Sequence, residues 1–206
     1  KKMLKELLKN TKFRNIIKKF FKEHEEEIID ILLFGSVVKG KELPKDIDIL
    51  MIYKSSQNFK LNKLLKNLIN KIWFNIEITS KTYRDLFDPS FSAREALISE
   101  GYSLILDRFI SEGLGYSNLY LFRYDLKNFK KSPRMRFYYS LYGRKKGEMG
   151  ILKKLNSYKF SERILITPID KVDKMKEYLD RWGIKYIEFP IIIPTRIVRS
   201  KAFIEK

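Results

Sequence analysis

Two apolar segments in the first quarter of the chain each meet a short polar motif. The first, Ile28–Phe34, runs directly into Gly35-Ser36. After nine intervening residues, Asp46-Ile47-Asp48 begins the second, Ile47–Ile52. Both segments have the composition of buried strands, in which side chains alternate between the two faces. Asp46 and Asp48 therefore share one face, while Ile47 and its neighbours point into a core. Carboxylates in a buried strand are costly unless they hold a metal, so this pattern predicts an acidic metal site on a sheet.

The Gly35-Ser36 pair adds a feature suited to phosphate. Glycine lets the backbone approach a ligand closely, and serine supplies a hydroxyl and an amide for phosphate oxygens. Gly-Ser by itself is usually a turn, and Asp-x-Asp by itself is usually a solvated strand edge. Their combination at this spacing is more specific. A phosphate-binding turn beside paired carboxylates indicates phosphoryl or nucleotidyl transfer.

The segment from Leu33 to Gly40, followed by Asp46-Ile47-Asp48, resembles the signature of the DNA polymerase beta-like nucleotidyltransferase superfamily, in particular the minimal nucleotidyltransferases of archaea and bacteria. The resemblance covers roughly residues 1–110 and implies an α+β fold: a mixed β-sheet nucleotidyltransferase core with helices on one side. It implies that Gly35-Ser36 opens a helix and that Gly35 and Ser36 bind the nucleotide. Lys39 is a further candidate for binding the nucleotide phosphates, with simple exposure to solvent as the alternative. The resemblance also implies that Asp46 and Asp48 hold two Mg²⁺ ions and that an NTP, ATP among the candidates, is the substrate.

The family has a third acidic residue on a later strand, and Glu77 is the candidate for this catalytic and metal-ligating position. Glu77 lies in the strand-like segment Trp73–Thr79, whereas most members carry aspartate there. The alternative is an exposed glutamate on an edge strand. A second departure is Lys45, where the family often has serine; we expect its side chain to point outward.

The remaining composition sets limits on the chemistry. The 206 residues suit one large domain or two small ones. The absence of cysteine excludes disulfides, thiolate metal sites and a thiol nucleophile, and the single histidine, His24, excludes a multi-histidine metal site. No apolar run has the length of a membrane span, so we expect a cytoplasmic protein without membrane association.

Beyond the nucleotidyltransferase core, assigned to residues 1–112, the Gly/Ser-containing segment 111–117 has the composition of a linker. Residues 118–206 are predicted to form a second small α/β domain of strand–helix–strand type. Its predicted elements are a helix over Arg134–Tyr142 ending at Gly143, a strand at Ile164–Thr167, a helix from Val172 to Trp182, and two strands, Ile184–Phe189 and Ile191–Ile193, separated by Pro190.

The chain carries a formal charge of +18, which favours polyanions as partners. Residues 121–160 hold 12 lysines and arginines against two acids, together with nine aromatic residues. This mixture is typical of surfaces that grip phosphates and stack bases, although the aromatics can equally form a core beneath solvated lysines. The candidate nucleic-acid-binding residues are Arg134, Arg136, Arg144, Lys145 and Lys146.

These observations predict a metal-dependent nucleotidyltransferase that transfers a nucleoside monophosphate from an NTP to an acceptor, most simply RNA, with DNA as the other nucleic-acid candidate. One alternative is a catalytically weak or inactive nucleic-acid-binding module. Another is adenylylation of a protein acceptor, as by antitoxin-like minimal nucleotidyltransferases. The sequence leaves the oligomeric state open.

Overall fold

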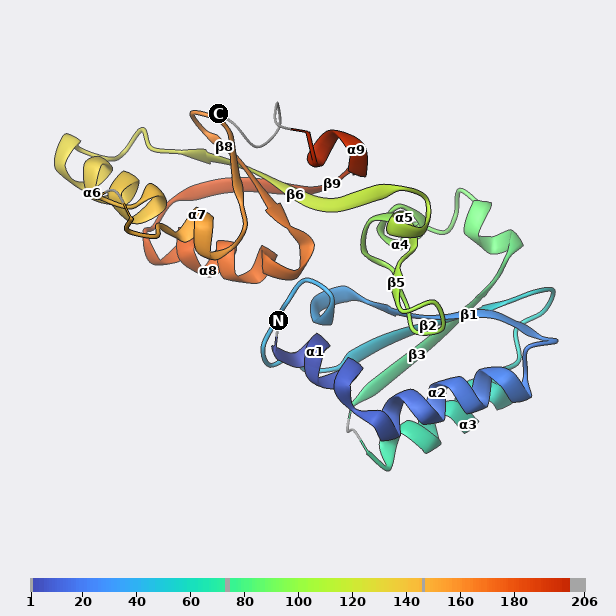
Figure 1. Ribbon diagram of the computed structural model, residues 1–206. Helices are drawn as coiled ribbons and strands as arrows, with labels where there is room; N and C mark the ends of the chain where they lie inside the picture. Colours follow the sequence, from blue (N-terminus) through green and yellow to red (C-terminus); the bar gives the residue numbers. More distant parts are fainter. Residues whose placement is uncertain (1, 73–74, 146, 201–206) are drawn as a thin grey trace. The chain divides into compact units, whose positions relative to one another are not determined.

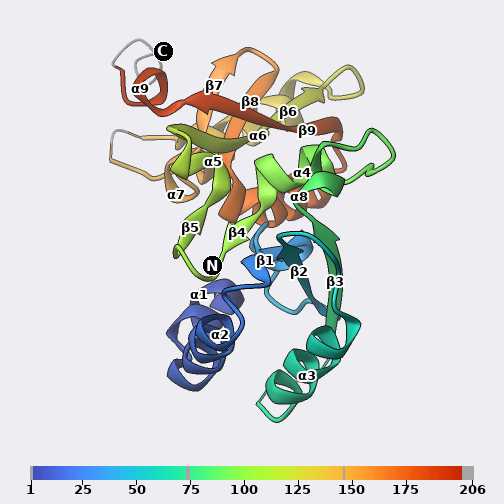
Figure 2. The same ribbon diagram turned by 90° about the vertical axis from the view of Figure 1, so that its right-hand side faces the viewer.

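The computed structural model describes residues 2–72, 75–145 and 147–200, and the chain divides into two compact units, Lys1–Leu114 and Gly115–Lys206. Figures 1 and 2 show both units, which we describe one at a time. No helix within these described ranges combines the length and apolar character needed to cross a membrane.

The first unit is built on a mixed sheet of five strands in the order β3-β2-β1-β4-β5. The strands are β1 (Ile28–Phe34), β2 (Ile47–Tyr53), β3 (Ile76–Thr82), β4 (Tyr102–Ser103) and β5 (Arg108–Phe109). β2 runs antiparallel to β1 and parallel to β3. β2, which carries Asp48, thus lies between β3 and β1, and β1 runs into the Gly35 turn.

Amphipathic helices cover one face of this sheet (Figure 1). They are α1 (Lys2–Lys9), α2 (Thr11–Glu23) and α3 (Phe59–Asn70). The helical spacing of Phe13, Ile17 and Phe20 buries one side of α2, while lysines occupy its exposed side. Asn10 caps α2 by accepting a hydrogen bond from the amide of Phe13, and Asn58 caps α3 in the same way.

The opposite face of β1 and β2 is also buried. Leu32, Leu50 and Ile52 pack there against Leu97 of α4 (Arg94–Glu100). Partly buried side chains complete this cluster: Leu86 of the 3₁₀ segment η2 (Arg84–Phe87), Phe91, and Ile110 of α5 (Ile110–Gly113). Burial on both faces explains why β2 is apolar at almost every position after Asp48.

The helix expected to begin at Gly35-Ser36 is reduced to a three-residue 3₁₀ segment, η1 (Gly35–Val37). The loop instead closes with hydrogen bonds from the amide of Gly40 to the Val37 carbonyl and from the amide of Lys41 to the Ser36 carbonyl. The helix dipole that could attract an anion to Gly35-Ser36 is therefore that of a single short turn.

The second unit has an antiparallel four-stranded sheet in the order β7-β8-β6-β9. Its elements are β6 (Tyr116–Asp125), α6 (Lys131–Tyr142), α7 (Ile151–Lys154), β7 (Tyr158–Ser161), β8 (Ile164–Pro168), η3 (Ile169–Lys171), α8 (Val172–Arg181), β9 (Lys185–Pro194) and α9 (Thr195–Val198). With α7, η3 and α9 set aside, the order is the split β-α-β-β-α-β arrangement. The two sheets with their packed helices confirm the α+β fold class.

Aromatic side chains form much of the core of this second unit. Phe137 of α6 is fully buried and contacts the rings of Tyr124 on β6 and Tyr178 and Trp182 at the α8 end. Phe122, also fully buried, contacts Tyr186 on β9. Several aromatics of the basic 121–160 segment therefore serve as core rather than as a binding surface.

Two expectations for the second half need correction. Pro190 does not separate two strands, because β9 continues through it with Pro190 opposite Tyr120. β9 is an edge strand, where proline is tolerated because one row of its amides has no partner strand to bond. The segment 111–117 does contain the boundary between the two units, after Leu114, but the connection is shorter than expected, since α5 extends to Gly113 and β6 begins at Tyr116.

Candidate metal centre and nucleotide site

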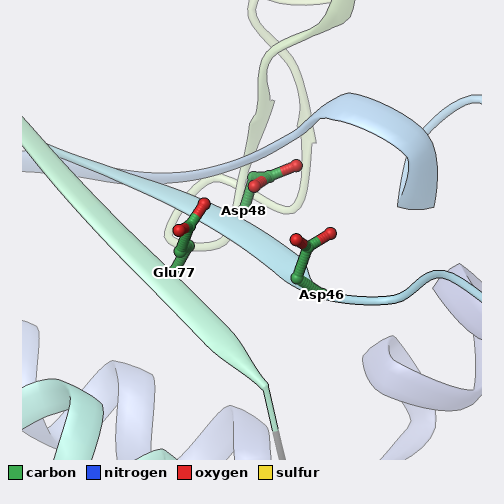
Figure 3. A group of neighbouring side chains, drawn as sticks. All are labelled: Asp46, Asp48 and Glu77. Carbon is green, nitrogen blue, oxygen red and sulfur yellow. The ribbon is translucent and has the colours of Figure 1, made fainter.

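Three carboxylates meet at one end of β2 and β3. Asp48 lies on β2, Asp46 precedes that strand by one residue, and Glu77 is the parallel-register partner of Asp48 on β3. Partners in register project from the same face of a sheet, and Asp46 shares that face by alternation. Figure 3 shows the three side chains on one side of the strands. One carboxylate oxygen from each lies within 4.8 Å of the others.

Gly35 lies directly against this cluster. Phe34, the residue before it, pairs with Asp48 across β1 and β2, and Gly35 then turns with φ +71°, in the left-handed region that favours glycine. A Cβ at this position would overlap Oδ2 of Asp48. Two features therefore favour glycine at position 35: the left-handed backbone of the turn and the close approach of the Asp48 carboxylate.

The electrostatics of the cluster favour a cation. Burial raises the pKa of Asp48 above its ordinary value, and the neighbouring charges of Asp46 and Glu77 raise it further. Three hard oxygen donors from separate side chains form the kind of ligand set that Mg²⁺ and related ions prefer. A bound divalent cation would offset the mutual repulsion of these carboxylates. The charge and the oxygen donors of Asp46, Asp48 and Glu77 therefore fit a divalent metal ion.

A cavity of about 180 Å³ opens beside the carboxylates. Its lining comes from β1, the Gly35 turn, β2, β3 and α4: Phe34, Gly35, Asp48, Ile49, Glu77, Thr79, Ala96 and Glu100. Sequence reasoning gave Glu100 no role, although it is only 6 % exposed. The signal in the sequence was a carboxylate two residues after the apolar stretch Ala96–Ile98, in the last turn of α4.

Lys39, expected to contact the nucleotide, forms an ion pair with Glu100. Its Nζ lies 3.0 Å from Oε1 of Glu100, so the loop after Ser36 is tied to α4 beside the cavity. The ammonium thus lies near the carboxylate cluster but is engaged by a buried acid. Ser36 follows Gly35 in the same turn and is half-buried, whereas Lys45 is exposed.

The five candidate nucleic-acid contacts of the second unit divide into different environments. The guanidinium of Arg134 donates hydrogen bonds to the carbonyls of Leu126 and Phe129, which ties α6 to the loop that precedes it. Arg136 and Lys145 are exposed, and Arg144 is exposed with its guanidinium 5.6 Å from the ring centre of Tyr139. Lys146 lies outside the described residues.

A comparison with protein families matches residues 15–100 to the model described as polymerase beta, nucleotidyltransferase. The matched range includes Gly35-Ser36, Asp46, Asp48, Glu77 and Glu100, that is, the carboxylate cluster and the cavity beside it. Neither the curated proteins nor the solved structures give a significant match to this chain. The family match, together with the mixed-sheet fold, identifies residues 15–100 as a polymerase beta-like nucleotidyltransferase domain.

Proposed function

We propose that this protein is a metal-dependent nucleotidyltransferase that transfers a nucleoside monophosphate from an NTP to a hydroxyl group of RNA. The observation that carries the proposal is the convergence of Asp46, Asp48 and Glu77 within 4.8 Å, against the glycine turn of a nucleotidyltransferase domain. In this reaction the acceptor hydroxyl releases its proton to solvent, and its oxygen forms a bond to the α-phosphorus. The bond from that phosphorus to the β-bridging oxygen breaks, and pyrophosphate leaves.

Asp46, Asp48 and Glu77 would hold the divalent metal, Mg²⁺ by its preference for oxygen ligands. Two such ions, when bound, would neutralise phosphate charge and favour ionisation of the attacking hydroxyl. The chain's own contribution is to fix the carboxylates on two adjacent strands, whose hydrogen-bonded register limits their movement. Glu77, which is exposed on the edge strand β3, would face the incoming acceptor.

Gly35 and Ser36 would bind the phosphates of the NTP. The absence of a side chain at Gly35 leaves its backbone open to close approach, and the Ser36 hydroxyl and amide can donate to phosphate oxygens. The Lys39–Glu100 ion pair would hold this loop in place beside the cavity, so we assign Lys39 a positioning role in addition to the electrostatic one.

The proposed RNA acceptor is supported by the charge of the chain. The formal charge is +18, and residues 121–160 carry most of the local excess, in a unit separate from the carboxylate cluster. Phosphate-binding surfaces are built from such lysines and arginines. A protein acceptor would not by itself call for this excess of positive charge.

The test is incubation of the purified full chain with each α-³²P-labelled NTP, Mg²⁺, and either total RNA or total protein. We expect label in RNA, and no label with the double variant Asp46→Asn, Asp48→Asn, which retains side-chain size. Label in protein alone would replace the acceptor by a polypeptide. RNA binding without any labelled product from the parent chain would identify a non-catalytic binding module and refute the proposed reaction.

A further inference from the structure

The second unit contains a cavity of about 600 Å³ that is separate from the carboxylate cluster. It lies where the end of α6, the short helix α7 and the start of β7 come together. Its lining residues are Tyr142, Leu152, Lys153, Asn156, Ser157, Tyr158 and Lys159. We call it the Tyr142 cavity. Its volume is in the range of cavities that hold small ligands or parts of larger ones.

The chemistry of the lining is basic and aromatic. Lys153 and Lys159 supply two ammonium groups, and no carboxylate is present among the seven lining residues. The residue Tyr142 is 40 % exposed, and Nζ of Lys159 lies 5.7 Å from the centre of its ring. Tyr138 lies close by with its ring nearly parallel to that of Tyr142, at 6.1 Å between centres. The exposed ring can stack a base when Lys159, an exposed and flexible side chain, exchanges the ring face for a phosphate.

Asn156 adds a polar group suited to a ribose. It is exposed at the cavity, held in a turn with φ +51°, and its side-chain amide offers both a donor and an acceptor. The 2′-hydroxyl of RNA is likewise both a donor and an acceptor, and DNA lacks it. The bases of a duplex are stacked against one another and could not reach the Tyr142 ring. An unpaired ribonucleotide fits all three features of the lining.

We infer that the Tyr142 cavity binds an unpaired nucleotide of single-stranded RNA, with the base against the Tyr142 ring and the flanking phosphates at Lys153 and Lys159. The inference rests on the proposed function for its choice of RNA as the acceptor. It places recognition in the second unit and assigns it to residues other than the arginine and lysine run that starts at Arg144.

The test is fluorescence anisotropy of a short fluorescein-labelled single-stranded RNA with the full chain, in EDTA and without NTP, so that binding is measured apart from catalysis. Tyr142→Leu should weaken binding by about 5- to 150-fold, the range that corresponds to the loss of one stacked base. Tyr142→Phe keeps the ring and should bind within a few-fold of the parent. Circular dichroism of both variants checks that α6 remains folded.

The double variant Lys153→Gln, Lys159→Gln tests the phosphate contacts. The slope of log K against log salt should flatten by about 1.4, since each phosphate contact on a single strand contributes about 0.7. The matched control is Lys12→Gln, Lys18→Gln on the exposed side of α2, which removes the same charge from the first unit and should leave the slope unchanged. Unlabelled duplex RNA and single-stranded DNA should compete less well than single-stranded RNA.

Three outcomes would overturn the inference: parent-like binding by Tyr142→Leu, equal competition by duplex RNA, or the same flattening of the salt slope in the α2 control. DNA competing as well as RNA would overturn the assignment of Asn156 to the ribose. None of these results depends on turnover. A chain that transfers nucleotides but fails these binding tests would leave the proposed function standing, and a chain that passes them without transferring nucleotides would refute only the reaction.

Discussion

Replacing Gly35 by alanine should lower the stability of the fold only slightly but remove most of the nucleotidyl-transfer activity. An L-residue in the left-handed region costs about 1–2 kcal/mol, and losing glycine's freedom in the unfolded chain returns about 0.4–1 kcal/mol. The expected net loss in the free energy of unfolding is therefore about 1 kcal/mol. The new Cβ would reach ordinary contact with Cγ of Asp48 at 3.4 Å but would overlap its Oδ2. Rotation of the carboxylate relieves that overlap at low cost in stability while moving a metal-ligating oxygen.

The displacement of Oδ2 should be on the order of 1 Å, and a misplacement of that size at a reacting centre can cost about 100-fold in rate. The assay compares urea unfolding with the initial rate of transfer from labelled NTP. The matched control is Gly183→Ala, since Gly183 has φ +63° and a Cβ there would meet nothing within 4 Å. Both variants should lose similar stability, and only Gly35→Ala should lose most of its transfer rate.

Equal transfer rates in the two glycine variants would refute this reasoning. They would mean either that the carboxylate of Asp48 is not a metal ligand or that its position tolerates displacement. A Gly35→Ala chain that fails to fold would be followed at lower temperature, with Mn²⁺ binding measured on the folded fraction by paramagnetic resonance. Weakened Mn²⁺ binding there supports the argument, and unchanged Mn²⁺ binding contradicts it.

Three further predictions concern the carboxylates and their surroundings. Burial and like charges raise the pKa of Asp48 above 3.8, so the ionised form of Asp48 destabilises the metal-free fold. In EDTA, Asp48→Asn should therefore raise the melting temperature at neutral pH. This gain should vanish as the pH falls below about 3.8, where Asp48 is protonated in both the folded and the unfolded chain. Glu77→Gln should lower the transfer rate by orders of magnitude while NTP affinity, measured by calorimetry, changes little; an equal loss of affinity would remove Glu77 from the acceptor side. Lys39→Met should lower the free energy of unfolding by roughly 1–3 kcal/mol, because it removes the ammonium that pairs with the buried carboxylate of Glu100. Glu100→Gln should cost less, and urea unfolding that ranks the two variants in reverse would contradict the ion-pair argument.

The sequence by itself determined the features that depend on local periodicity. Strand alternation placed Asp46 and Asp48 on one face and Ile47 on the other, and the apolar run before Gly35 predicted a strand ending at a turn. The helical stripe of Val172, Met175 and Leu179 likewise predicted α8, and all three residues are buried. These features follow from the geometry of a single segment, which repeats every two residues in a strand and every 3.6 in a helix.

Only the tertiary structure decided which segments meet. Glu77 joins Asp48 through the register of two parallel strands connected by α3, and Lys39 joins Glu100 through the packing of α4 against the sheet. Arg134, a nucleic-acid-binding candidate by sequence, also donates to the carbonyls of Leu126 and Phe129. Such pairings depend on the relative placement of distant elements, which the hydrophobic pattern of any one element does not encode. The sequence could therefore name the acidic residues. Their convergence on a common point arises from strand register and packing, and so does the contact between Gly35 and the carboxylate of Asp48.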